Sequence, residues 1–208
     1  MTTTSAVESF EIERKYEVSG EAELPSADRF AAAGLRLGAP TAHELHATYF
    51  DTVDGGLARH RLALRSRVGG EDQGWHLKEK SDEGVRELHW PLSEAMPEGL
   101  RREIGRLLTV EEIDAIRPIA TLRTHRITIP VYDRGGTQLI ELADDRVVAT
   151  NELSGRTQRW REWEAELVPG SDAGVLDDIE PLLARAGATR VRGTSKIQRT
   201  MQPEDAAS

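Results

Sequence analysis

Residues 9–18 read Ser9-Phe10-Glu11-Ile12-Glu13-Arg14-Lys15-Tyr16-Glu17-Val18, and this stretch decides the fold of the chain. Side chains two positions apart on a β-strand share a face. In an extended strand, the charged residues at 11, 13, 15 and 17 line one face, whereas most of the apolar residues line the other. The stretch therefore predicts a strand with one charged face and one apolar face.

Length and composition set the class of protein. The chain has 208 residues, of which 38% are hydrophobic and 30% are charged, enough for a globular core. We expect a single domain over residues 1–208, with a core at about 9–200 and flexible termini. The N-terminus lacks a basic region followed by an apolar run, and no stretch reaches about 20 apolar residues, so we expect a cytoplasmic protein.

Charge and cysteine content exclude several kinds of site. The formal net charge of −9 disfavours nucleic acid and anionic membranes as partners. The absence of cysteine excludes disulfides and thiol nucleophiles. Neither a P-loop nor a dinucleotide-binding glycine motif is present, so any phosphate binding must come from side chains. We expect a monomer or a homodimer.

The pattern along the chain indicates mostly strands with a few helices. Expected strands cover residues 9–18, 43–51, 62–68, 74–80, 85–92, 119–132, 137–143, 147–152 and 159–168. Expected helices cover residues 26–33, 100–108, 110–116 and 172–186. The close turns favour an α+β fold with an antiparallel sheet, and closing this sheet into a barrel removes its edges.

Acidic and basic residues are segregated on different strands. The first strand and the strand at 159–168 carry acids, and Glu162, Glu164 and Glu166 share one face with Trp160. The strands between carry bases, with Arg65 and Arg67 on one face of residues 61–68. His76, Lys78 and Lys80 share a face of the next strand, and Glu87 shares one with His89 in the strand after it.

Two arrangements fit such strands. Either the apolar faces pack inward and the charges meet water, or the sheet closes with its charges inside and helices cover its apolar outside. Buried charge is costly unless it is paired or solvated. Because ordinary solvated faces mix both signs, the segregation favours the second arrangement. The acids suit a hard divalent cation, and the bases suit a polyanion.

The order of these motifs resembles the CYTH-domain family of triphosphate tunnel metalloenzymes. Glu11-x-Glu13-x-Lys15 resembles the family's ExExK signature, and Tyr49-Phe50-Asp51-Thr52 resembles its YFDT segment. Further matching segments are Leu64-Arg65-Ser66-Arg67, Leu77-Lys78, Arg86-Glu87, Arg123-Thr124-His125-Arg126, Glu141-Leu142-Ala143-Asp144-Asp145, Glu164-Ala165-Glu166-Leu167 and Ser195-Lys196. The resemblance covers about residues 9–199.

The resemblance implies an eight-stranded antiparallel β-barrel, a triphosphate tunnel with a charged interior and covering helices. It implies a requirement for Mg2+ or Mn2+ and a small-molecule triphosphate substrate. The implied metal ligands are Glu11, Glu13, Glu164 and Glu166, with Asp144 and Glu162 as further candidates. The implied phosphate ligands are Arg65, Arg67, Lys78, Arg126 and Lys196, with Lys80 and Arg123 as further candidates. Lys15 would orient or activate the attacking water, and Glu87 would bind metal through water or position a base.

Several alternatives stay open at the level of sequence. Either Arg123 or Arg126 fills the basic position of its strand, and two of the three glutamates 162, 164 and 166 hold metal. His76 and His89 are the histidines that a tunnel could expose. The leading function is hydrolysis of inorganic triphosphate to pyrophosphate and phosphate. The alternatives are a thiamine or nucleoside triphosphatase, a class IV adenylate cyclase and a non-catalytic phosphate-binding module.

Overall fold

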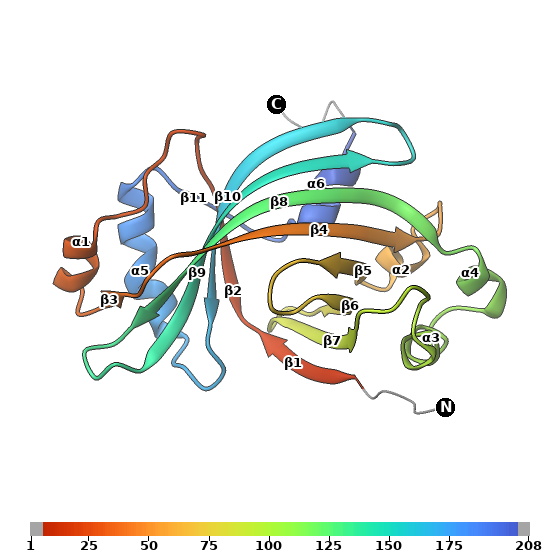
Figure 1. Ribbon diagram of the computed structural model, residues 1–208, viewed down its shortest axis with the longest axis horizontal. Helices are drawn as coiled ribbons and strands as arrows, with labels where there is room; N and C mark the ends of the chain where they lie inside the picture. Colours follow the sequence, from red (N-terminus) through yellow and green to blue (C-terminus); the bar gives the residue numbers. More distant parts are fainter. Residues whose placement is uncertain (1–5, 204–208) are drawn as a thin grey trace.

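A computed structural model describes residues 6–203, and their strands form a ring (Figure 1). β1 (Val7–Glu11) and β2 (Glu13–Glu17) are two halves of one bent strand. β1 pairs with β7 and β2 pairs with β10, so the path of pairing returns to the strand where it began. The other strands of the ring are β4 (Thr41–Asp51), β5 (Leu62–Val68), β6 (Gly74–Lys80), β7 (Val85–Pro91), β8 (Arg117–Tyr132), β9 (Gln138–Asn151) and β10 (Thr157–Leu167).

The ring has the order β1/β2, β7, β6, β5, β4, β8, β9, β10, and every neighbouring pair is antiparallel. β1 and β2 count as one strand and seven more complete the ring, which confirms the predicted eight-stranded antiparallel tunnel fold. Two short strands add to it, because β3 (Arg36–Leu37) pairs with β8 and β11 (Thr189–Val191) pairs with β2.

Two strand predictions were wrong in detail. The single strand expected at 9–18 is interrupted at Ile12, whose carbonyl accepts a hydrogen bond of 2.9 Å from the Leu167 amide. The two strands expected at 137–143 and 147–152 are one continuous strand, β9. Its charged centre reads as a turn in the sequence, but ion pairs with neighbouring strands hold the two aspartates of that centre within the sheet.

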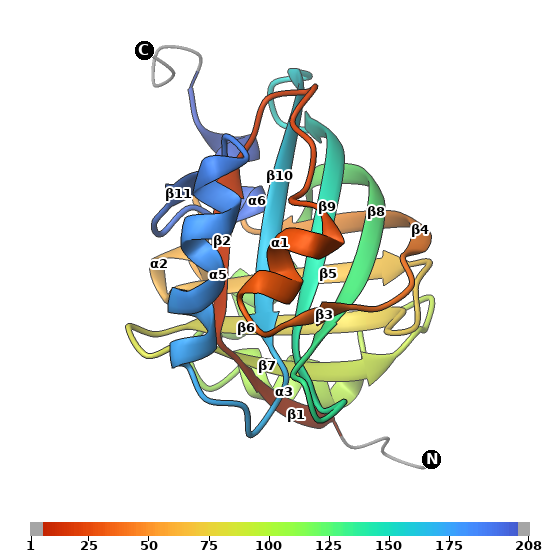
Figure 2. The ribbon, with the colours of Figure 1, turned by 90° about the vertical axis from the view of Figure 1, so that its left-hand side faces the viewer.

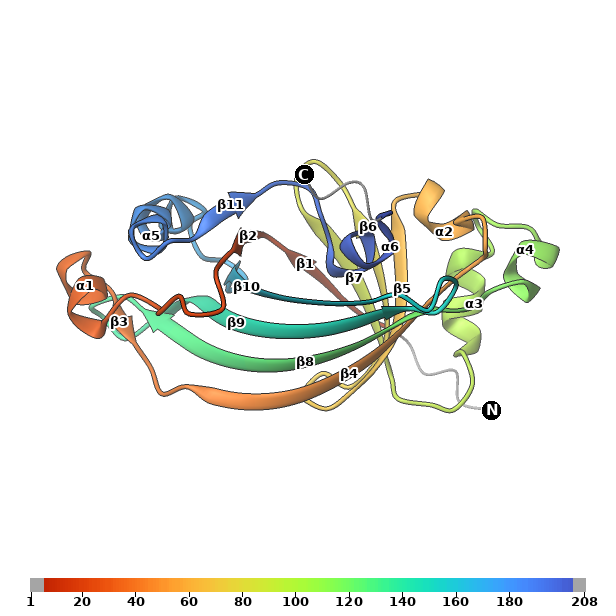
Figure 3. The same cartoon turned by 90° about the horizontal axis from the view of Figure 1, so that it is seen from above.

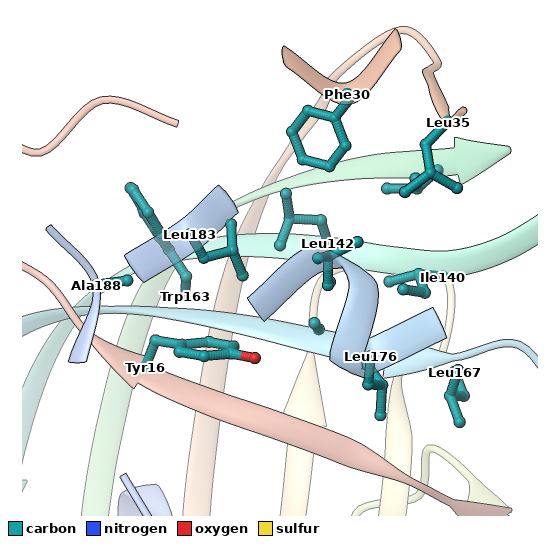
Figure 4. Packing of buried hydrophobic residues seen from close by; sticks show 13 residues of the cluster. Tyr16, Phe30, Leu35, Ile140, Leu142, Trp163, Leu167, Leu176, Leu183 and Ala188 are labelled. Atoms are coloured by element: carbon teal, nitrogen blue, oxygen red, sulfur yellow. The ribbon is translucent and has the colours of Figure 1, made fainter. Parts of the chain in front are cut away.

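One apolar core lies outside the barrel, against the outer face of β2, β9 and β10. α1 (Ala27–Ala32) and α5 (Gly174–Arg185) cover this face (Figure 2). Tyr16 and Trp163 project from the strands and meet Leu183 of α5 (Figure 4). Burial of a large side chain contributes about 1.5–3 kcal/mol, so this core attaches the helices to the sheet.

A second core covers the outer face of β5, β6 and β7. Its helices are α3 (Glu98–Ile104) and α4 (Val110–Asp114), with the short α2 (Gly56–Arg59) beside them. Leu64, Leu77 and Trp90 point outward into this core. The apolar strand faces thus pack under helices, as the resemblance implies.

Part of the barrel interior is apolar, which the expectation of a charged interior did not include. α6 (Lys196–Met201) lies on the concave side of the long strands (Figure 3). Ile197 and Met201 of α6 pack against Leu122, Val147 and Ala149 of the sheet. The remaining open interior is therefore lined by charged residues next to an apolar part.

The expected flexible termini fall mainly in residues 1–5 and 204–208, outside the described part of the chain. Among the described helices, none has both the length and the apolar character that a bilayer crossing requires.

Candidate active site

A cavity of about 1260 Å3 lies inside the barrel. It contains most of the side chains that the sequence singles out, because residues two apart on each strand point inward together. The predicted residues that line it are Glu11, Glu13, Lys15, Arg65, Arg67, Lys78, Lys80, Arg126, Glu164, Glu166 and Lys196. The fold thus brings acids and bases from distant parts of the chain into one space.

One wall carries a row of carboxylates that outnumber the lysines paired with them. Glu13, Glu166 and Glu141 lie directly opposite one another on β2, β10 and β9. Burial, together with the nearby Glu13 and Glu164, raises the pKa of Glu166 above its ordinary value. Within residues 6–203, Glu166 makes no ion pair shorter than 4.0 Å. Like charges placed opposite each other destabilise a sheet, so this row fits a bound divalent cation.

Glu11 adds to this row from β1. Burial and the neighbouring Glu87 carboxylate raise the pKa of Glu11 to about 8, although Lys78 Nζ lies 2.6 Å from its carboxylate. Carboxylate oxygens are the ligands that Mg2+ and Mn2+ prefer. The predicted ligands Glu11, Glu13 and Glu166 therefore form a suitable set of donors.

A second acidic group is already balanced by cations. Carboxylate oxygens of Asp145, Glu162 and Glu164 lie within 4.8 Å of one another, close enough to hold a metal ion. Lys196 Nζ lies 2.8, 2.6 and 2.8 Å from these three carboxylates in that order. Arg126 also pairs with Asp145 and Glu164, at 2.6 Å to each. Burial opposes ionisation, but the neighbouring cations hold the pKa of Asp145 below its ordinary value.

Lys15 lies between two of the predicted metal ligands. Its Nζ is 3.0 Å from Glu13 and also pairs with Glu164. Burial disfavours the ammonium form, but Glu164 and Glu13 outweigh it and hold the pKa of Lys15 above its ordinary value. Lys15 is therefore a positive charge placed among the carboxylates.

The opposite wall presents arginines with unused donors. Within the described residues, the buried Nε atoms of Arg65 and Arg67 have no hydrogen-bond partner. Burial beside Arg65 and Arg126 lowers the pKa of Arg67 to about 9. Asp72 pairs with the Arg67 guanidinium from a neighbouring turn. Buried donors without acceptors are costly, so this wall is suited to an anion that brings oxygen acceptors.

Glu87 lies beneath this wall and does not line the cavity. Its carboxylate is 3.6 Å from Arg65 and 3.6 Å from Lys78. His76 Nδ1 is 2.7 Å from the same carboxylate. The structure therefore places Glu87 behind the basic residues, in contact with two of them and with His76.

Besides Glu87, three other predicted site residues do not line the cavity. Asp144 points to the outer face, where it pairs with Arg161 at 2.7 Å, because its neighbour Asp145 takes the inward position on β9. Arg123 is exposed on the outer face for the same reason of alternation, so Arg126 fills the basic position inside. Glu162 faces inward but does not line the cavity, since Lys196 and the indole of Trp160 cover it.

Sequence reasoning missed Asp145, Glu141 and Tyr49 as inward residues. Strand alternation from Glu141 to Asp145 along β9 was the signal that could have found both acids. Tyr49 lines the cavity, and its hydroxyl lies 3.5 Å from an Arg65 nitrogen.

One matched motif is structural. Asp51 is buried and accepts hydrogen bonds from the amides of Thr52, Leu57 and Ala58 at 2.7, 2.7 and 3.1 Å. The Thr52 hydroxyl also accepts one from the Gly56 amide at 2.6 Å. These bonds build the turn into α2, so this part of the motif shapes the end of β4.

Known proteins resemble this chain in sequence and in fold. The sequence matches the CYTH domain over residues 9–201. Uncharacterised proteins from two strains of Mycobacterium tuberculosis are 34% identical over 208 residues, covering 92% of this chain and 40% of each relative. The chain thus spans well under half the length of these relatives.

Two solved structures share the fold. A proposed adenylate cyclase from Bacillus halodurans has a TM-score of 0.63 at 23% identity, covering 94% of this chain and 99% of that chain. A proposed adenylyl cyclase from Hippeastrum, described as having a dominant triphosphatase activity, has a TM-score of 0.54 at 20% identity, covering 93% and 95%.

Proposed function

Because the chain belongs to the CYTH domain family, we propose that it is a divalent-metal-dependent triphosphatase. The proposed reaction converts inorganic triphosphate and water to pyrophosphate and phosphate. The single observation that carries it is the pair of opposing walls in one cavity. Glu11 and Glu13 have Lys78 and Lys15 as partners, but Glu166 has no ion pair within the described residues, and the buried Nε atoms of Arg65 and Arg67 have no acceptor there.

The chain's own side chains supply the binding of the polyanion. Arginine binds phosphate oxygens bidentately and lysine acts as a point charge. In this proposal Arg65, Arg67, Lys78 and Arg126 hold the phosphate chain, with Lys80 and Lys196 toward its ends. Mg2+ or Mn2+, held by the carboxylate row with Glu164, would neutralise phosphate charge and lower the pKa of bound water.

Hydrolysis forms a bond between water oxygen and the terminal phosphorus and breaks the bridging P–O bond. Such transfer depends on positioning and on stabilisation of charge at the equatorial oxygens. The proposal gives Lys15 the task of orienting the attacking water from its place between Glu13 and Glu164. Glu87 keeps Arg65 and Lys78 in place from behind.

A second candidate is favoured by the apolar part of the cavity. Tyr49, Leu122 and Ile197 line it beside the charged part. An organic group attached to the triphosphate would bury apolar surface there. This observation supports thiamine triphosphate or a nucleoside triphosphate as substrate, including a class IV adenylate cyclase reaction in which the ribose 3′-hydroxyl replaces water.

One parallel assay tests these functions. The purified protein is given Mg2+ or Mn2+ with inorganic triphosphate, thiamine triphosphate or ATP. We expect phosphate release, fastest from inorganic triphosphate and abolished by a chelator. Faster release from thiamine triphosphate or ATP would favour the second candidate, and cyclic AMP would identify a cyclase. Triphosphate binding without turnover on any of the three would indicate a non-catalytic binding module.

The cytoplasmic location, the monomeric or homodimeric state and the single-domain organisation stay predictions from sequence.

A further inference from the structure

His76 is a buried histidine under the phosphate-binding wall. Its residue is 1% exposed, and it lies on the inward face of β6 between Arg65 of β5 and His89 of β7. It does not line the cavity. A buried imidazole in direct contact with a carboxylate of the site needs a reason to be there, because an apolar residue would fill the same space without the cost of burying polar atoms.

Both ring nitrogens of His76 face oxygen acceptors. Nε2 lies 2.9 Å from the Asp72 carbonyl oxygen, and Nδ1 lies 2.7 Å from Glu87 Oε1. A carbonyl oxygen can only accept, so Nε2 is the donor in that bond. The Nδ1 partner is a carboxylate oxygen, so a contact of 2.7 Å is a hydrogen bond only where one of the two atoms carries a proton. The ring is thus fixed at both ends.

Each end of the ring connects to a different part of the basic wall. Through Nδ1, His76 holds Glu87, whose carboxylate is 3.6 Å from both Arg65 and Lys78. Through Nε2, it holds the turn after β5 at Asp72, whose carboxylate pairs with Arg67. These two contacts link one imidazole, through Glu87 and Asp72, to three basic side chains from two strands.

We propose that His76 is a positioning residue that fixes Glu87 and the Asp72 turn, and so sets Arg65, Lys78 and Arg67 in the geometry that binds the triphosphate chain. The proposal rests on the proposed function. Long basic side chains lose rotamer freedom when they bind an anion, and holding them in place beforehand reduces that cost. Groups behind the direct ligands of a site commonly have this effect.

Substitutions at position 76 separate the two ends of the ring. His76→Asn places an amide NH2 near the position of Nδ1 and so keeps a donor for Glu87. His76→Gln places one near Nε2 and keeps a donor for the Asp72 carbonyl. His76→Phe removes both. His89→Gln is the matched control, because the His89 ring packs at 4.7 Å from the His76 ring, and within residues 6–203 its side chain hydrogen-bonds only to the Gln73 carbonyl oxygen.

The measurement is kcat and KM of each variant in steady state, with inorganic triphosphate as substrate and Mn2+ as the metal. We expect His76→Phe to lower kcat/KM by about 10- to 100-fold. His76→Asn should restore most of kcat while KM stays raised, since Arg67 loses its support. His76→Gln should leave kcat low, and His89→Gln should match the wild type. Thermal unfolding of each variant establishes that it is folded. Equal losses in the Asn and Gln variants, or a fully active Phe variant, would overturn the proposal.

Measurements of triphosphate binding distinguish a failure of the positioning role of His76 from a failure of the proposed function. If the wild type hydrolyses no triphosphate, the proposed function fails, and calorimetry with inorganic triphosphate then decides the role of His76. A weaker affinity in His76→Phe that His76→Asn partly restores would support positioning. Equal affinity in the wild type and His76→Phe, or no triphosphate binding by the wild type, would refute it.

Discussion

Charged residues that are neighbours in sequence point to opposite faces of this barrel, because side chains alternate along a strand, one inward and the next outward. Asp145 enters the interior and pairs with Arg126 and Lys196, whereas Asp144 pairs with Arg161 on the outer face. The two aspartates have the same chemistry and nearly equal burial. Because only Asp145 points inward, Asp145 belongs to the candidate site, whereas Asp144 belongs to the surrounding scaffold.

The carboxylate row gives a first prediction at the residue scale. Glu13→Gln removes one negative ligand, so we expect turnover to be lost while the fold persists. Isothermal titration with Mn2+ in the presence of triphosphate should show weaker metal binding. Glu8→Gln is the control, since Glu8 lies on the same bent strand but pairs with Arg86 at the surface, where ion pairs contribute little. A Glu13→Gln variant with normal activity would remove Glu13 from the metal site.

The two aspartates give a second prediction. Breaking a buried ion pair costs about 3 to 5 kcal/mol, so Asp144→Asn and Asp145→Asn should both lower the unfolding temperature. Only Asp145→Asn should raise KM for triphosphate, because it frees Arg126 and Lys196 from their places in the cavity. Unfolding curves and steady-state kinetics on the two variants provide the comparison. Equal kinetic effects would contradict the assignment of their faces.

At the scale of elements, two short helices carry the same N-terminal motif in different settings. Ser195 and Gln198 form a capping box on α6, and Thr109 and Glu112 form one on α4. Lys196 follows directly after the α6 cap, so this cap fixes the helix that brings Lys196 to the acidic group. Arg199 further anchors α6 by an ion pair of 2.6 Å with Glu17 and by stacking on Trp160.

These matched caps allow a third prediction. Loss of a capping side chain costs about 1 kcal/mol, so Ser195→Ala and Thr109→Ala should destabilise the protein by similar amounts. Only Ser195→Ala should reduce triphosphate turnover, since α4 lies outside the barrel. Hydrogen exchange should be faster at the amides of the affected helix in each variant. A Thr109→Ala variant that loses as much activity would show that global stability, rather than α6, controls the site.

At the scale of the whole molecule, the barrel has apolar outer faces covered by helices, and its interior combines charged side chains with an apolar part against α6. Helices cover the outer faces of β2, β9 and β10 and of β5, β6 and β7, while the interior gathers both signs of charge. Within residues 6–203, Glu166 has no ion pair, and the buried Nε atoms of Arg65 and Arg67 have no hydrogen-bond acceptor. A bound metal and a polyanion would complete these contacts.

The molecule should therefore become more stable when its interior is filled. At a free ligand concentration of 100 times Kd, binding stabilises the folded state by about 2.7 kcal/mol. We expect Mn2+ with inorganic triphosphate to raise the unfolding temperature more than either one alone. Differential scanning calorimetry with and without chelator tests this, and an unchanged unfolding temperature would contradict the proposed binding site.

The sequence by itself determined most of the strands and their charged faces, although it divided β9 into two strands. The hairpin of β5 and β6 was predicted residue for residue, since alternation and glycines mark its limits. The segregation of acidic and basic strands favoured a closed sheet with its charges inside, and the resemblance to the CYTH family implied its eight strands. These features are local, or depend on strand order alone, so they can be read along the chain.

Only the tertiary structure decided which charges meet. The choice of Asp145 over Asp144 and of Arg126 over Arg123 depends on register between strands, which a one-residue shift reverses. The place of Glu87 behind the basic wall, the link from His76 to two of its parts and the packing of α6 inside the barrel depend on contacts between residues far apart in sequence. Their physical cause is the closure of the sheet, which sets distant strands face to face.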